Sequence, residues 1–166
     1  GDEVITTPLT FAATANVVLH TGADVRFCDV DIRTGNIDAS RVEKCITKKT
    51  KAIIAVHFAG CPCEMDVLSR ICKKHGLALI EDAAHALGGK YKNKNLGAWG
   101  DIAAFSFYAT KNITTGEGGM IVTRRKALAR TIRMLSLHGL DEDAWRRYDT
   151  KGNPFYAVRF AGYKYN

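Results

Sequence analysis

An acidic pair and an imidazole follow a short apolar stretch of the chain. Glu81 and Asp82 come directly after residues 77–80, and His85 lies three residues further on. In open α/β sheets, ligands bind outside the carboxyl ends of the strands. A carboxylate buried at such a position is costly unless a cationic group meets it. This segment is therefore the first place where we expect chemistry.

A hydroxyl and an amine follow a second apolar stretch in the same way. Ser106 lies within residues 103–108, and Lys111 comes shortly after them. Residues 112–119 are rich in glycine, which allows a backbone to approach a ligand closely. Together with the first segment, this gives one carboxylate, one imidazole, one hydroxyl and one lysine at strand ends.

A pyridoxal phosphate site needs this set of groups. The lysine forms an aldimine with the cofactor aldehyde and later moves protons. The carboxylate keeps the pyridine nitrogen protonated, so that the ring accepts electrons. Hydroxyls and backbone amides hold the phosphate.

Each of these residues also has an ordinary structural role. Lys111 would then be a surface lysine, and Asp82 a turn or N-cap residue. His85 would be a hydrogen-bonded structural histidine, and Ser106 would satisfy a neighbouring backbone group. The spacing alone does not decide between these roles and a cofactor site.

Strand and helix patterns alternate along the chain, and such alternation predicts a three-layer α/β/α fold with a mostly parallel sheet. The helix expected over residues 10–19 opens with a threonine near its cap position. The helix at 38–46 starts at Asp38, and the helix at 64–75 stops at Gly76. The remaining expected elements are strands at residues 4–6, 25–30, 52–57, 77–81, 103–108 and 119–123, and a helix at 126–137.

Composition excludes several classes of protein. The 166 residues are 46% hydrophobic and 25% charged, which is typical of one globular domain and not of a disordered chain. The apolar runs are too short to cross a bilayer. The net charge of +7 comes from dispersed basic residues. This charge is typical of a basic, solvated surface. The alternative is an anionic partner such as a phosphorylated ligand, and the dispersed residues do not indicate nucleic-acid binding.

The five cysteines are odd in number and irregularly spaced, which does not indicate a disulfide scaffold. Cys61 and Cys63 form a single C-x-C pair without a second pair nearby, so we expect no metal site. We expect reduced thiols and a cytoplasmic location.

Three motifs closely resemble the DegT/DnrJ/EryC1/StrS family of pyridoxal phosphate-dependent sugar aminotransferases. The longest runs from Phe105-Ser106-Phe107 through Lys111-Asn112-Ile113-Thr114 to Gly116-Glu117-Gly118-Gly119. The others are the Glu81–Ala86 stretch and Thr10-Phe11-x-Ala13-Thr14 near the start of the chain. The ending, Gly162-Tyr163-Lys164-Tyr165-Asn166, is most similar to the branch that makes 4-amino-4-deoxy-L-arabinose on a UDP carrier.

The resemblance implies a role for each matching position. Lys111 would be the Schiff-base lysine, and Asp82 would pair with the pyridinium nitrogen. His85 would lie near the phenolic oxygen of the ring, and Phe11 would stack on the ring. Ser106 would bind the phosphate.

Asn166 lies in the segment that reaches the partner subunit's site in the family. Many relatives carry arginine at that position and asparagine two residues earlier, where this chain has Lys164. Asn166 is therefore a cofactor-binding candidate that departs from the family pattern.

The resemblance also implies how the chain is organised. Residues 1–140 would be the cofactor-binding large domain of the fold-type-I transferases, in incomplete form, and residues 141–166 a connecting segment. The family's Gly-Thr phosphate loop would precede Gly1, and its small C-terminal domain would follow the last residue.

The implied activity is transfer of an amino group from glutamate to a nucleotide-linked ketosugar of the UDP-4-keto pentose or hexose type, by a homodimer. Two alternatives remain at this point. One is a catalytically silent or regulatory module. The other is a different fold-type-I reaction, such as an elimination or a desulfuration that uses Cys61 or Cys63.

Overall fold

The structure is a computed structural model that describes residues 1–140 and 157–165. The chain divides into two compact units, Gly1–Val122 and Thr123–Asn166, and each is described by itself. The predicted boundary between residues 140 and 141 stays a prediction. Among the described residues, none of the helices has both the length and the apolar character that a bilayer-spanning segment needs.

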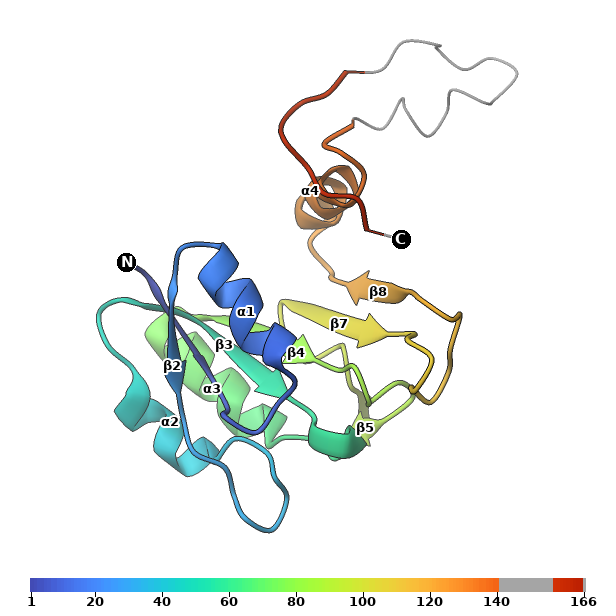
Figure 1. Ribbon diagram of the computed structural model, residues 1–166. Coiled ribbons are helices and arrows are strands. Elements are labelled where there is room, and N and C mark those ends of the chain that lie inside the picture. Colours follow the sequence, from blue (N-terminus) through green and yellow to red (C-terminus); the bar gives the residue numbers. More distant parts are fainter. Residues whose placement is uncertain (141–156, 166) are drawn as a thin grey trace. The chain divides into compact units, whose positions relative to one another are not determined.

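A sheet of six strands forms the centre of the first unit in the described part of the chain, in the order β2-β1-β3-β4-β7-β8 (Figure 1). The first five of these strands run parallel, and β8 runs antiparallel to β7. The predicted mostly parallel sheet is thus confirmed. The strands are β1 (Glu3–Thr6), β2 (Asp24–Phe27), β3 (Thr50–Val56), β4 (Ala78–Asp82), β7 (Ile102–Ser106) and β8 (Gly119–Val122).

Helices cover both faces of this sheet because each face carries apolar side chains. Along β3, Ile53 and Ala55 are buried in one cluster and Ile54 in another. Successive side chains of a strand point to opposite faces, so the two clusters lie on opposite sides of the sheet. The helices are α1 (Ala12–His20), α2 (Ala39–Cys45) and α3 (Met65–His75).

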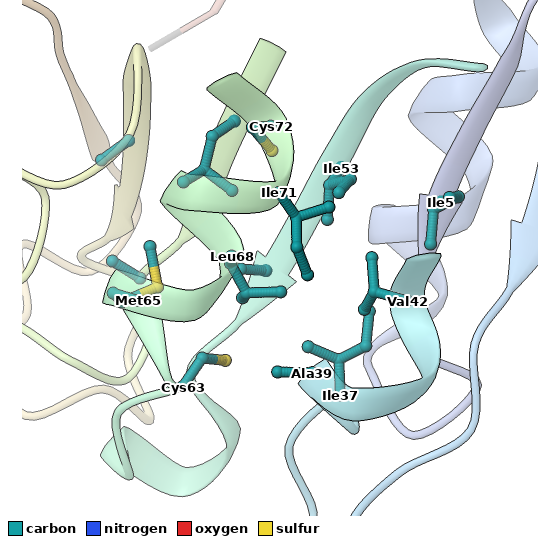
Figure 2. Close-up of a cluster of buried hydrophobic side chains, with 14 of the residues drawn as sticks. Ile5, Ile37, Ala39, Val42, Ile53, Cys63, Met65, Leu68, Ile71 and Cys72 are labelled. Atoms are coloured by element: carbon teal, nitrogen blue, oxygen red, sulfur yellow. The ribbon is translucent and has the colours of Figure 1, made fainter. Parts of the chain in front are cut away.

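The larger cluster lies between the sheet and helices α2 and α3. Figure 2 shows its aliphatic and sulfur-containing side chains meeting between the helices and β3. Leu68 of α3 and Val42 of α2 are fully buried there. The smaller cluster joins Val18 of α1 to Ile54. The three-layer arrangement follows from these two clusters.

Two of the predicted helix ends are found in the structure, and one is not. The Asp38 carboxylate accepts the Ser40 N–H at 3.0 Å at the start of α2, and α3 ends at Gly76 with φ 66°. The cap predicted at the start of the first helix is wrong. In the described structure Phe11 is the N-cap residue of α1 and makes no side-chain cap bond, because the Thr10 hydroxyl bonds to the Thr14 hydroxyl at 2.8 Å instead.

Strands β2 and β7 end at least two residues earlier than predicted, where side chains near their ends bond to the backbone. After β2, Asp29 accepts the Val30 N–H at 2.8 Å, and Asp31 accepts the Arg33 N–H at 2.8 Å. After β7, the Ser106 hydroxyl accepts the Tyr108 N–H at 3.3 Å. Each bond turns the chain out of the sheet.

A small hairpin was not predicted from the sequence. It pairs β5 (Lys90–Tyr91) with β6 (Lys94–Asn95) in antiparallel register. Lys92 and Asn93 between them have φ of 45° and 62°, the left-handed conformation of a tight hairpin turn. Each of its strands has only two residues, and Tyr91 alone packs against the hydrophobic cluster, so hydrophobic periodicity gave no signal.

In the second unit, helix α4 (Lys126–Ser136) occupies the region predicted to be helical. Leu128, Ile132 and Leu135, the face predicted to be apolar, are half-buried. Residues after the helix pair through two isolated bridges, Leu137 with Lys164 and Leu140 with Val158.

A fully buried acid, Glu81, ties separate loops to the end of β4. Its Oε1 accepts the Trp99 N–H at 2.8 Å and the Gly100 N–H at 2.7 Å. Its Oε2 accepts the Gly97 N–H at 2.8 Å and lies 3.2 Å from His57 Nε2. The Cys63 N–H donates a hydrogen bond to His57 Nδ1 at 3.2 Å. Nδ1 is therefore the acceptor of the imidazole, and the N–H at Nε2 donates a hydrogen bond to Glu81.

These donors replace the cationic partner that a buried carboxylate was expected to need. Burial by itself raises the pKa of Glu81, but the hydrogen bonds from His57, Gly100 and Gly97 outweigh burial and lower the pKa below its ordinary 4.5. The ionised form is therefore the stable one in the folded chain.

Replacing Glu81 tests this interpretation. A carboxyl whose folded pKa is lowered stabilises the fold above the unfolded value of about 4.5, and this contribution is lost as the pH falls through the folded value. We expect Glu81→Gln to lower the free energy of unfolding by about 1–3 kcal/mol near neutral pH, because an amide NH₂ cannot accept from the backbone donors. The difference from the wild type should shrink as the pH falls below about 5.

Urea unfolding of both proteins at a series of pH values measures this difference. The exposed Glu117 provides the control, since Glu117→Gln should change stability little at any pH. A loss for Glu81→Gln that stays constant from neutral to acid pH would contradict the ionised, hydrogen-bonded carboxylate.

Candidate functional site

The predicted site residues of the first unit lie at the carboxyl ends of neighbouring parallel strands. Asp82 is the last residue of β4, and Ser106 is the last residue of β7. Strand β4 pairs with β7 in parallel, with Asp82 opposite Ala104. Phe11 lies between β1 and α1, and β1 belongs to the same parallel set.

Lys111 and His85 are in direct contact. Lys111 Nζ lies 2.6 Å from His85 Nε2, although 26 positions separate the two residues in the sequence. Lys111 comes from the loop after β7 and His85 from the loop after β4, so the neighbouring strands bring them together. A proton shared at this distance can pass between the two nitrogens.

The loop that carries Lys111 is closed by bonds at its base. The Phe107 N–H donates to Gly118 O at 2.8 Å, and Phe107 O accepts the Thr115 N–H at 3.0 Å. The Lys111 N–H itself donates to Tyr108 O at 2.9 Å. These backbone bonds fix the glycine-rich segment relative to β7.

The loop that carries His85 rests on a glycine. A Cβ at Gly60 would lie 2.8 Å from the backbone oxygen of His85. Gly60 also has φ of 84°, which L side chains rarely adopt. Both the close approach and the backbone conformation therefore require glycine at position 60. The segment after β3 thus packs against the backbone of His85.

The Asp82 carboxylate faces α1, on the side of β4 opposite to Glu81. Its Oδ2 accepts the Thr14 hydroxyl at 2.8 Å, and its Oδ1 accepts the Ala84 N–H at 3.2 Å. Asp82 is half-buried, while Thr14 is buried. The two donors orient the carboxylate and leave it partly open to solvent.

The remaining predicted residues differ in their surroundings. The Phe11 side chain is 82% exposed at the start of α1, so its ring is free to stack on a ligand. The Ser106 hydroxyl is half-buried and accepts the Tyr108 N–H. Asn166 lies outside the described residues.

Sequence reasoning missed Thr14 and His57. Thr14 stood in a quoted motif without a role, and its hydroxyl lies 2.8 Å from that of Thr10, which precedes the N-cap residue Phe11. His57 follows the apolar run of β3 directly, in the same relation to its strand as the residues that were singled out. Its partner Glu81 could not be inferred, because the other donors are backbone groups.

The thiols of the C-x-C pair lie in unlike surroundings. Cys63 is buried, and its Sγ donates to Val56 O at 3.1 Å. Burial raises the pKa of the Cys63 thiol to about 12, so it stays protonated near neutral pH. Cys61 is exposed. All five cysteines are described, and all are free.

Solved structures of sugar aminotransferases share this fold. The Helicobacter pylori aminotransferase PseC, involved in the biosynthesis of pseudoaminic acid, superposes with a TM-score of 0.89 at 37% identity. The match covers 99% of this chain and 42% of PseC. A putative sugar aminotransferase, Spr1654 from Streptococcus pneumoniae, superposes in its PLP form with a TM-score of 0.87 at 32% identity, over 100% of this chain and 45% of that one.

A third solved structure was determined in the presence of a nucleotide sugar. It is DesI with its TDP-sugar product, which matches with a TM-score of 0.82 at 37% identity, over 99% of this chain and 39% of DesI. The predicted type of fold, a mostly parallel sheet of the fold-type-I transferases, is confirmed by these neighbours.

The sequence comparisons agree with the structural ones. The spore coat polysaccharide biosynthesis protein SpsC of Bacillus subtilis is 52% identical over 166 residues, which are 100% of this chain and 43% of SpsC. The chain thus spans less than half of the length of the relatives it matches. The family model of the DegT/DnrJ/EryC1/StrS aminotransferases matches residues 1–166, and this chain belongs to that family.

Proposed function

We propose that this chain carries the cofactor-binding centre of a pyridoxal phosphate-dependent aminotransferase. The observation that carries the proposal is the 2.6 Å contact between Lys111 Nζ and His85 Nε2, at the strand ends that also present Asp82. Membership of an aminotransferase family supports it. So does the PLP form of a structural neighbour.

The residues present fit this cofactor. An amine is available for its aldehyde, and a carboxylate already held by two donors is available for its ring nitrogen. An exposed aromatic ring at Phe11 offers a stacking surface. When bound, pyridoxal phosphate supplies an electron sink for the carbon that gains or loses the amino group.

Three residues of the chain then have separate roles. Lys111 is the covalent attachment point, and its Nζ moves the proton to and from the substrate carbon. His85 Nε2 accepts a hydrogen bond from that amine and keeps it in place. Asp82 holds the proton on the ring nitrogen.

Ser106 and Asn166 complete the proposed cofactor site. The Ser106 hydroxyl at the end of β7 is assigned to the phosphate, since a hydroxyl can donate to a phosphate oxygen. For Asn166 the support is the resemblance of the chain's ending to the family, in the segment that reaches a partner subunit. A homodimer is therefore part of this proposal.

The proposed substrates are glutamate as the amino donor and a nucleotide-linked ketosugar, of the UDP-4-keto pentose or hexose type, as the acceptor. The structure of DesI in the presence of its TDP-sugar product supports the nucleotide-sugar class. The net charge of +7 agrees with an anionic diphosphate substrate. The polysaccharide biosynthesis named for SpsC supports a role in cell-envelope polysaccharides. Free thiols throughout agree with a reducing, cytoplasmic location.

A cysteine-dependent reaction is the weaker alternative. A nucleophilic cysteine needs a thiolate, and the raised pKa of Cys63, about 12, opposes one. A silent or regulatory module would not need Lys111 beside an imidazole. The experiments below separate it from an enzyme.

Trapping the cofactor tests the attachment point. Borohydride treatment of the intact protein loaded with pyridoxal phosphate should leave the reduced cofactor on the peptide that contains Lys111, as read by mass spectrometry. Lys111→Ala should lose this label and nearly all amino transfer, a loss of about a thousandfold or more, because the nucleophile and the proton carrier disappear together.

Lys92→Ala is the matched control, since Lys92 lies at the turn of the β5–β6 hairpin and pairs with Asp66 at 2.8 Å. It should keep both the label and the activity. Label on another lysine, or undiminished amino transfer by Lys111→Ala, would refute the proposed role of Lys111.

Adding glutamate alone distinguishes an enzyme from a silent module. We expect glutamate to convert the bound cofactor to its amine form, with loss of the visible absorbance and release of 2-oxoglutarate. Adding UDP-4-keto sugars should then restore the visible band. Unchanged absorbance with every amino donor tried would favour the silent module.

A further inference from the structure

Two hydroxyl groups stand behind Asp82 in a continuous hydrogen-bonded row. Thr14 Oγ1 donates to Asp82 Oδ2 at 2.8 Å, and Thr10 Oγ1 lies 2.8 Å from Thr14 Oγ1. Thr14 is only 6% exposed. The row joins the start of α1 to the end of β4, across 68 positions of sequence.

The direction of this row follows from the number of hydrogens. An ionised carboxylate only accepts, and a threonine hydroxyl has a single hydrogen to donate. Thr14 therefore gives its hydrogen to Asp82, and its oxygen is left to accept from Thr10. All the dipoles then point toward the carboxylate, so that each bond polarises the next.

The same row orients the Asp82 carboxylate. Thr14 holds one carboxylate oxygen, and the Ala84 N–H adds a second donor on the other oxygen. Each carboxylate oxygen can accept more than one hydrogen bond. Capacity therefore remains for a protonated ring nitrogen, in an orientation that the two donors have already fixed.

We propose that Thr14, supported by Thr10, is a positioning residue that keeps the Asp82 carboxylate aimed at the ring nitrogen of pyridoxal phosphate. This inference rests on the proposed function. The competing role is a purely structural tie between α1 and the sheet. That role would change stability and leave cofactor affinity unaltered.

Two variants of Thr14 separate these roles. Thr14→Val keeps the shape and removes the hydroxyl, whereas Thr14→Ser keeps the hydroxyl. For the intact apoprotein titrated with pyridoxal phosphate, we expect Thr14→Val to raise the dissociation constant about tenfold or more, as loss of a hydrogen bond to a charged group implies. Thr14→Ser should stay within about threefold of the wild type.

Kinetics with glutamate give a second measure. Because Asp82 acts on the cofactor and not on the donor, kcat should fall in the cofactor-saturated Thr14→Val protein while KM for glutamate changes little. Thr10→Val removes only the outer bond of the row and should raise the dissociation constant by a smaller factor, about threefold. It also serves as the test should Thr14→Val fail to fold.

Thr6 provides the matched control. It is a fully buried threonine of β1 whose hydroxyl donates to Ile54 O at 3.2 Å. Thr6→Val should lower the melting temperature without changing cofactor affinity. The inference is overturned if Thr14→Val binds the cofactor like the wild type, if Thr6→Val weakens binding equally, or if Thr14→Ser fails to rescue it.

Failure of the proposed function can be distinguished from failure of this inference. If the wild type itself takes up no pyridoxal phosphate and shows no borohydride label at Lys111, both proposals are wrong. If the wild type is labelled and Thr14→Val and Thr10→Val bind as it does, only the role of the threonine row is refuted.

Discussion

The site depends on two adjacent acids at the end of β4 that face opposite sides of the sheet. Alternation along a strand separates their side chains, so that Glu81 is fully buried while Asp82 is half-buried beside α1. Glu81 gathers Gly97, Trp99, Gly100 and His57 around one carboxylate. A buried charge held by several donors has little freedom to move, and its neighbour in the chain therefore starts from a fixed backbone.

Parallel pairing then brings the chemical groups to one edge. Asp82 and Ser106 end strands β4 and β7, and the loops that carry His85 and Lys111 follow them. The two strands are direct neighbours. Gly60 lets the segment after β3 pass beneath His85. The rigid parts of the site are thus backbone and buried side chains, while Lys111, His85 and Phe11 remain accessible to a ligand.

Much of this fold could be predicted from the chain alone, because apolar periodicity and end signals such as Asp38 and Gly76 are local. The hairpin at Lys90–Asn95 could not, since strands of two residues are too short to show an apolar periodicity. The pairing of Glu81 with His57 and distant N–H groups also lay beyond reach, because it arises only once the strands are aligned. Thr10 looked like a helix cap, and the competing bond to Thr14 became visible only in three dimensions. Resemblance singled out Lys111 and Asp82, whereas spacing alone left them ambiguous.

A crystal structure of the intact protein with pyridoxal phosphate tests the central claim most directly. The account predicts electron density continuous from Lys111 Nζ to the cofactor, and a ring nitrogen within about 2.6–3.2 Å of an Asp82 carboxylate oxygen. It also predicts that the Thr14 hydroxyl stays on the other side of that carboxylate. A cofactor bound elsewhere, or a ring nitrogen turned away from Asp82, would contradict it.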